Sequence, residues 1–340
     1  EVPKALTSLK YFHENAPQYA IVAAGSLLGV ALHQGTSFPV GKVDFLDLYP
    51  LNFREFLCAM GEKQFVSMLD SCDTQMVTVF KTKYIERLRE YYFVGGMPEV
   101  VKDFSEKKDY NRVRAIQKNL INYYQQDFSK HAEIKLVPRL NLVWNSIPMQ
   151  LAKENKKYIY GQVREGSRAK DFELAIQWLL DCGLIHKVQR IQKPDLPLKA
   201  YIDFDAFKLF LVDIGLLIAM TDLDAKVIIE GNKIFTEFKG ALTEQYILQQ
   251  LISDVGVIPY YYSTQNSKGE IDFLVQGKTS VIPIEVKAEE NLKAKSLKAF
   301  CEKYQPSYAV RTSMSDYREQ DWMTNIPLYA IKWIENYVNQ

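Results

Sequence analysis

The chain has 340 residues, of which 47% are hydrophobic and 24% charged, and its formal net charge is +1. This composition is that of a globular protein, and the near-zero charge excludes global attraction to nucleic acid. The four cysteines show no metal-type spacing, which favours a reducing, cytoplasmic setting. The longest uncharged apolar run, residues 19–32, is shorter than the roughly 18 residues of a spanning helix, so we predict no membrane span.

Residues 1–58 read as a helix followed by buried strands. The predicted segments are a helix at 4–14 and strands at 20–24 and 43–48. Continuous apolar strands are typical of a parallel sheet covered on both faces. Asn52 is suited to cap a helix that begins at Phe53. The chain begins with Glu1, and we expect it to start within a longer protein.

Residues 59–225 are predicted to be mainly helical. A turn at Gly95-Gly96-Met97-Pro98 interrupts the first part, 59–135. In the second part, 136–225, Ser167 can cap a helix that ends near Asp181, and a strand pair follows. Helices followed by a strand pair suggest a winged helix. The stretch 153–193 has nine basic and five acidic residues, and Arg168 and Lys170 lie where a recognition helix could reach phosphates of DNA.

Residues 226–340 contain the most informative feature of the chain, a predicted hairpin. Glu270–Val275 and Ile282–Ala288 alternate apolar and polar residues, and a five-residue turn separates them. A hairpin centred between Lys278 and Thr279 brings Asp272 opposite Glu285 and Glu270 opposite Lys287. Opposite residues share one face of the sheet. Two carboxylates and a lysine on one face suit a divalent metal and a reacting phosphate.

Asp272 followed by Glu285-Val286-Lys287 resembles the PD-(D/E)XK signature of restriction-endonuclease-like nucleases, without the proline before the aspartate. The resemblance implies that Asp272 and Glu285 bind magnesium or manganese and that Lys287 is catalytic. Such nucleases often add a carboxylate from an upstream helix. Glu244 matches it, as a metal ligand or a catalytic residue that positions water.

The whole chain resembles prokaryotic AAA-type ATPases that carry a winged helix and this nuclease-like domain. The supporting stretches are Tyr49–Phe56, Gly95–Glu99, Gln177–Ile185 and Phe207–Leu217. Ser26 matches the nucleotide-sensing position of the family. The phosphate-binding pattern Gly-x-x-x-x-Gly-Lys-Ser/Thr does not occur in the sequence, so ATP binding is expected only of a full-length form. The ATPase core is the part through which such proteins could form oligomers.

The expected fold is therefore α/β and multidomain. Its expected parts are a partial parallel-sheet ATPase core (1–58), a helical segment (59–135), a winged helix (136–225) and a restriction-endonuclease-like α/β domain (226–340). Two functions stay open: a metal-dependent nuclease acting on DNA, or a non-catalytic DNA- or protein-binding regulator that keeps the nuclease fold. A basic residue that occupies the carboxylate site would favour the second. Arg54 is either an arginine finger or, in the simpler interpretation, the partner of Glu55 or another surface acid.

Overall fold

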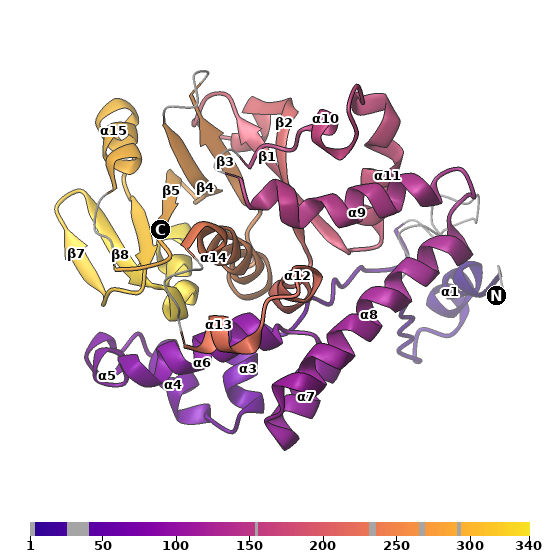
Figure 1. The fold of residues 1–340 in the computed structure, drawn as a ribbon, viewed down its shortest axis with the longest axis horizontal. Coiled ribbons are helices and arrows are strands. Elements are labelled where there is room, and N and C mark those ends of the chain that lie inside the picture. The colour runs from indigo at the N-terminus through magenta and orange to yellow at the C-terminus, as the bar shows by residue number, and fades with distance from the viewer. Residues whose placement is uncertain (1–3, 26–40, 154–155, 231–235, 265–268, 291–293) are drawn as a thin grey trace.

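One eight-stranded sheet forms the centre of the C-terminal half, with strand order β2-β1-β3-β4-β5-β6-β8-β7 (Figure 1). The structure is a computed structural model that describes residues 4–25, 41–153, 156–230, 236–264, 269–290 and 294–340. The strands are β1 (Ile185–Ile191), β2 (Ile202–Leu211), β3 (Tyr260–Ser263), β4 (Glu270–Gln276), β5 (Val281–Val286), β6 (Val310–Ser313), β7 (Arg318–Gln320) and β8 (Met323–Pro327).

This sheet crosses the boundary expected at 225/226. The antiparallel pair β1–β2, expected to belong to a winged helix, joins the rest because β1 runs parallel to β3. The pairing of Arg190 with Tyr261 and of Ile191 with Tyr262 forms the junction. The predicted hairpin is β4–β5, and β6 and β8 extend the sheet in parallel. The β1–β2 hairpin is therefore an integral edge of the large sheet.

The N-terminal and middle helices precede β1 in the chain, and most of them lie beside the sheet (Figure 1). They are α1 (Lys4–Asn15), α3 (Phe53–Ala59), α4 (Lys63–Asp70), α5 (Thr74–Val79), α6 (Lys81–Val94), α7 (Pro98–Lys107), α8 (Tyr110–His131), α9 (Val137–Leu151), α10 (Tyr160–Val163) and α11 (Ala169–Asp181). The later helices are α12 (Ile214–Met220), α13 (Ala225–Ile229), α14 (Thr236–Gln250), α15 (Lys295–Tyr304) and α16 (Glu335–Val338). In the part of the chain that the structure describes, no helix is long and apolar enough to cross a membrane.

Several local predictions are confirmed. Asn52 caps α3, because its side chain accepts from the Glu55 backbone N–H while the Glu55 carboxylate accepts from the Asn52 backbone N–H. The helical prediction for 59–135 is confirmed by α4 to α8, of which α8 is the longest. The predicted helix from Ser167 begins later, at Ala169, and Arg168 is its N-cap residue. The hairpin β7–β8 was not predicted.

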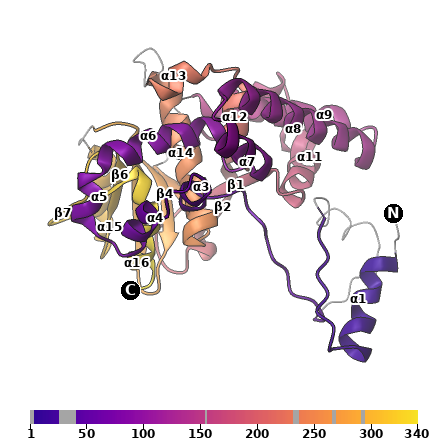
Figure 2. The same ribbon diagram turned by 90° about the horizontal axis from the view of Figure 1, so that it is seen from below.

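The two strands expected at 20–24 and 43–48 do not form, so that prediction was wrong. Residues 20–25 and 43–48 have no regular secondary structure. Their apolar side chains face solvent: Val22 is 93%, Leu46 91% and Leu48 93% exposed. Figure 2 shows α1 and these extended segments standing away from the body. A parallel strand needs neighbouring strands for its hydrogen bonds, and the described part of the chain supplies none here.

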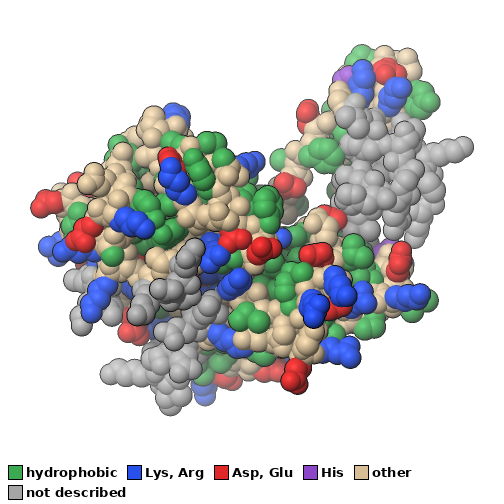
Figure 3. Space-filling model, turned by 90° about the horizontal axis from the view of Figure 1, so that it is seen from above, with side chains coloured by type: hydrophobic (Ala, Val, Ile, Leu, Met, Phe, Trp, Pro, Cys, Tyr) green, Lys and Arg blue, Asp and Glu red, His purple; other side chains and the backbone are tan. Residues whose placement is uncertain are grey.

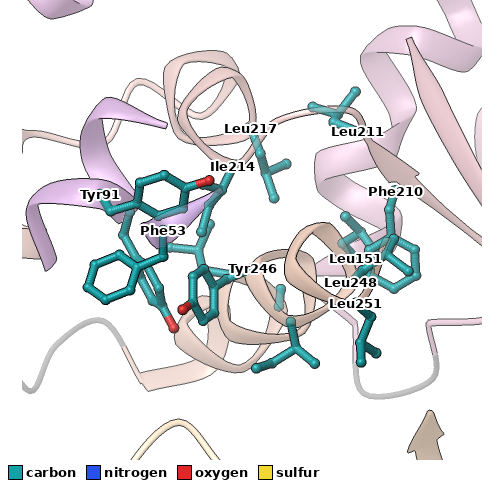
Figure 4. Packing of buried hydrophobic residues seen from close by; sticks show 14 of the residues in the cluster. Phe53, Tyr91, Leu151, Phe210, Leu211, Ile214, Leu217, Tyr246, Leu248 and Leu251 are labelled. Atoms are coloured by element: carbon teal, nitrogen blue, oxygen red, sulfur yellow. The ribbon is translucent and has the colours of Figure 1, made fainter. Parts of the chain in front are cut away.

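Helix α14 lies at the middle of the hydrophobic core, where Tyr246, Leu248 and Leu251 contact segments from much of the chain (Figure 4). The rings of Phe53 and Tyr91 meet Tyr246 edge to face, at centroid distances of 6.5 and 5.9 Å. The helix is buried on all sides, so its polar residues also lie inside. Buried polar groups need hydrogen-bond partners, and the glutamines of α14 find theirs on other segments.

A buried polar junction holds the stretch around Leu51 to α6 and α12. The Leu51 backbone N–H donates to the Gly96 carbonyl at 2.8 Å, and its carbonyl accepts from the Tyr91 hydroxyl at 2.5 Å. The fully buried Asp213 carboxylate accepts from the Gly96 N–H at 2.6 Å and from the Gln249 amide at 3.2 Å. Three of the family-supporting stretches thus meet at one point.

Gly96 gives a direct test of this junction. A Cβ at position 96 would lie 2.1 Å from the Leu51 carbonyl oxygen, so the backbone would have to move apart. We expect Gly96→Ala to lower the free energy of unfolding by about 3 kcal/mol, the cost of strong overpacking. The measurement is urea unfolding followed by circular dichroism.

Gly161→Ala in α10 is the matched control, because no atom lies within 4 Å of the added carbon. It should leave stability unchanged or raise it by up to about 1 kcal/mol, since alanine favours a helix over glycine. Equal stability of the two variants would contradict the close contact at Gly96.

Candidate functional site

The β4–β5 hairpin has the register that the sequence predicts. Phe273 pairs with Ile284 and Gln276 with Val281, and the same register, continued by one residue, brings Asp272 opposite Glu285. The Asp272 carboxylate also accepts from the Val286 backbone N–H at 2.7 Å. The alternation of the two strands thus gathers both carboxylates on one face, as their period of two requires.

Glu244 comes to the same site from α14, but it is not free. It is 5% exposed, and its carboxylate forms an ion pair and hydrogen bond with Lys156. Its second oxygen lies 3.6 Å from the Lys208 ammonium. Burial alone would raise the pKa of Glu244, but these two lysines lower it below the usual value. The carboxylate is therefore ionised and held by two cations.

Lys208 is the most deeply buried charge of the site. It extends from β2, is fully buried, and lies 2.5 Å from the Glu270 carboxylate and 4.8 Å above the ring of Tyr261. Burial alone would lower the pKa of Lys208, but the carboxylates of Glu244, Glu270 and Asp272 raise it above the usual value. Buried charges persist only when they are paired, and this lysine is paired on several sides.

Asp272 and Glu285 experience the opposite environment. Burial, together with the negative charges of Glu244 and Glu285, raises the pKa of Asp272 well above its usual range. Burial also raises the pKa of Glu285, although Lys287 at 2.5 Å counteracts it. Glu285 pairs across the sheet with Arg311 on β6, whose guanidinium is another nearby cation. One Glu285 oxygen is buried without a hydrogen-bond partner.

The charges of this cluster balance without a metal. The carboxylates are Glu244, Glu270, Asp272 and Glu285, and the cations are Lys156, Lys208, Lys287 and Arg311. In the described residues, no three His, Cys, Asp or Glu side chains are grouped to hold a metal ion. A hard divalent cation needs several free oxygen ligands, which ion pairs with lysine remove. We call these eight residues the charge cluster.

The other expected site residues lie elsewhere. Ser26 is outside the described residues. Arg168 and Lys170 are exposed at the start of α11, as DNA contact requires. Arg54 forms ion pairs with Asp70 at 2.5 Å and Asp254 at 2.8 Å, as the simpler interpretation of Arg54 expects, with different acids.

Much of the positive charge in 153–193 is used within the fold. Lys156 pairs with Glu244, Arg190 with Asp203, and Lys193 with Asp195. On the face drawn in Figure 3, basic, acidic and hydrophobic side chains are interspersed among the described residues. The net positive charge counted along the sequence therefore overstates the cationic surface that this region offers to a phosphate backbone.

The sequence analysis missed Lys156 and Lys208. Lys208 carried a signal, because it is the one charge within the run Ala206–Val212 of β2, and a lysine in a buried strand needs a buried partner. Lys156 carried none: it lies in a short connection after α9, and only the fold brings it to Glu244.

Comparison with protein families gives three matches that together span most of the chain. Residues 1–57 match an AAA domain. Residues 85–227 and 239–331 match two domains of unknown function, DUF8612 and DUF4143. No curated protein and no solved structure matches the chain significantly. The N-terminal match shows that residues 1–57 are similar to an AAA domain, and the winged-helix and nuclease interpretations stay predictions.

The pKa shifts predict opposite effects of two substitutions. The raised pKa of Asp272 means that its ionised form costs stability at neutral pH, and that this cost disappears as the pH falls through the raised value. We expect Asp272→Asn to raise the free energy of unfolding at pH 7 by about 1 kcal/mol or more, since one pKa unit is worth about 1.4 kcal/mol.

Glu244→Gln is the counterpart. A lowered pKa contributes stability above the unfolded value, near 4.5, and this contribution is lost as the pH falls. The substitution removes the ion-pair partner of Lys156 and one of the carboxylates beside the buried Lys208, so stability at pH 7 should fall by about 3 kcal/mol. Urea unfolding at pH 7 and pH 4 measures the free energy of unfolding of the Asp272→Asn and Glu244→Gln variants and of the unmodified chain. Destabilisation by Asp272→Asn at pH 7 would contradict the raised pKa.

Proposed function

We infer from the AAA-domain match at residues 1–57 that the chain belongs to an AAA-type ATPase, and we propose that its C-terminal α/β region is a non-catalytic binding module of nuclease-like fold. The observation that carries the proposal is the pairing of Glu244 with Lys156 and Lys208. In a metal-dependent nuclease this carboxylate would face a metal or an attacking water. Here two ammonium groups occupy that position, and one of them is fully buried.

A metal-dependent nuclease is the second candidate. Asp272, Glu285 and Lys287 have the register of the nuclease signature, and a buried oxygen of Glu285 lacks a hydrogen-bond partner. These two observations favour a cation at the hairpin. Against it, Lys287 already neutralises Glu285, and adding a divalent ion to the balanced charge cluster would leave two uncompensated positive charges in a buried site.

The residues present do not fit magnesium-ATP. The sequence lacks the glycine-rich loop with Lys-Ser/Thr that binds the phosphates. A calorimetric titration with magnesium-ATP should therefore give no saturable heat of binding. Tight binding would contradict the conclusion that the chain lacks a phosphate-binding site.

A protein partner suits the module better than DNA. Three basic residues of the expected winged-helix region, Lys156, Arg190 and Lys193, form ion pairs within the protein. The exposed Arg168 and Lys170 are followed by Asp171 and Glu173 in the same helix. DNA binding depends on several cations that each neutralise a phosphate. Weak, salt-sensitive DNA binding that is lost in an Arg168→Glu, Lys170→Glu double variant would favour DNA instead.

The decisive experiment is plasmid cleavage with manganese. We expect the chain to nick supercoiled DNA no faster than its Asp272→Ala and Lys287→Ala variants, because Glu244 and Glu285 are neutralised by lysines. Manganese should also leave the unfolding midpoint unchanged, since a ligand that binds the folded state raises it.

Cleavage by the unmodified chain that both substitutions abolish would establish the nuclease and refute the proposal. Glu302→Gln is the matched control: its carboxylate is exposed on α15, away from the charge cluster, and neither activity nor the metal response should change.

A further inference from the structure

A second site lies away from the charge cluster, between the AAA-matching segment and the helical region. A cavity of about 240 Å³ is enclosed by the segment Leu48–Pro50, the start of α7, helix α8 and the turn from α11 to β1. Parts of four family-supporting stretches line it: Tyr49–Phe56, Gly95–Glu99, Gln177–Ile185 and, through Val212, Phe207–Leu217. The charge cluster has no residue in its lining, so the cavity is a separate feature.

Four of the thirteen residues that line this cavity are aromatic. Tyr49, Tyr124, Phe128 and Trp178 line it, and Phe128 meets Trp178 edge to face at a centroid distance of 5.4 Å. Aromatic faces carry negative partial charge and attract cations within about 6 Å of the ring centre. An aromatic lining therefore suits an organic cation as well as a neutral apolar group, and a further charge must decide between them.

Asp127 on α8 supplies that charge. It lines the cavity, and its carboxylate is close enough to two other lining residues, Cys182 and Tyr124, to raise their pKa values. Burial, then Asp181 and then Asp127 raise the pKa of Cys182 to about 12. Burial, then Asp213 and then Asp127 raise the pKa of Tyr124 to about 12. Across the described residues, Asp127 takes part in no ion pair, and Lys, Arg and His are absent from the lining.

A histidine beside the lining residue Tyr49 does not provide a positive charge either. His186 lies beside Tyr49, with their ring centroids 6.3 Å apart. Burial lowers the pKa of His186 to about 4, so the imidazole is neutral at physiological pH. Asp127 forms no ion pair among the described residues, and the lining of the cavity has no basic side chain. Such a carboxylate beside aromatic rings is the complement of a positively charged ligand.

We propose that this cavity binds one organic cation, an alkyl guanidinium or alkyl ammonium group, with its charge on Asp127 and its carbon chain against Trp178 and Tyr124. The volume is below the roughly 300 Å³ of pockets for drug-sized ligands, so it accommodates one such group. The group could come from a free small molecule or from an arginine or lysine side chain of a polypeptide. This inference is independent of the proposed function.

The test titrates the chain with butylguanidinium, butylammonium and N-acetyl-arginine methylamide. Butylurea, a neutral molecule of the same shape as butylguanidinium, is the ligand control. Fluorine NMR of 5-fluorotryptophan-labelled protein reports the cavity, and the resonance of Trp178 is assigned with a Trp178→Phe variant. We expect a saturable shift of the Trp178 resonance with the cations and none with butylurea.

Asp127→Asn should weaken cation binding about tenfold, the loss expected for one charge-assisted hydrogen bond. Glu133→Gln, which removes an exposed carboxylate just after α8, is the matched control and should bind as the unmodified chain does. Binding of the capped arginine alone would identify a polypeptide side chain as the source, and binding of all three cations a free small molecule as well. Equal binding of butylurea, no saturation with any cation, or unchanged affinity of Asp127→Asn would overturn the proposal.

Discussion

The burial of α14 on all sides is the constraint on which the rest of the structure depends. A helix without a solvent face must satisfy its polar side chains inside the protein. The Gln250 side chain accepts from the Phe53 backbone N–H at 2.8 Å. The Gln245 side chain accepts from the Leu211 backbone N–H and donates to the Leu211 carbonyl. The Gln249 side chain accepts from the Ile214 backbone N–H and donates to the Asp213 carboxylate. Each glutamine thus holds a different segment, and the helix positions the N-terminal stretch, the β2 end and α12 together.

The same burial decides the chemistry of Glu244. A carboxylate on an enclosed helix stays ionised only beside cations, and Lys156 and Lys208 come from two segments that precede α14 in the chain. The hairpin carboxylates then lie in a site whose charges already balance. A pattern that resembles a metal-dependent active site is in this way compatible with an ion-pair cluster that stabilises the fold.

The stretches that support the family resemblance serve packing more than catalysis. Gly96 allows the Leu51 carbonyl to approach, and Asp213 receives two backbone N–H groups, of Gly96 and Leu216. Because Arg54 is also bound to Asp254, the end of the AAA-matching segment is tied directly to the region after α14. Beside this junction the same stretches line the aromatic cavity, whose wall also contains the Asp127 carboxylate.

Local patterns in the sequence determined much of this protein. The period-two alternation fixed the register of Asp272 against Glu285, the capping box at Asn52 fixed the start of α3, and the apolar stripe of α11 fixed that helix, because each depends on residues close in the chain. The tertiary structure alone decided the partners of Glu244, the joining of β1 to β3, and the lack of strands at 20–24 and 43–48. Ion pairs and strand pairs need partners from distant segments, and no local pattern specifies which segment the fold will bring.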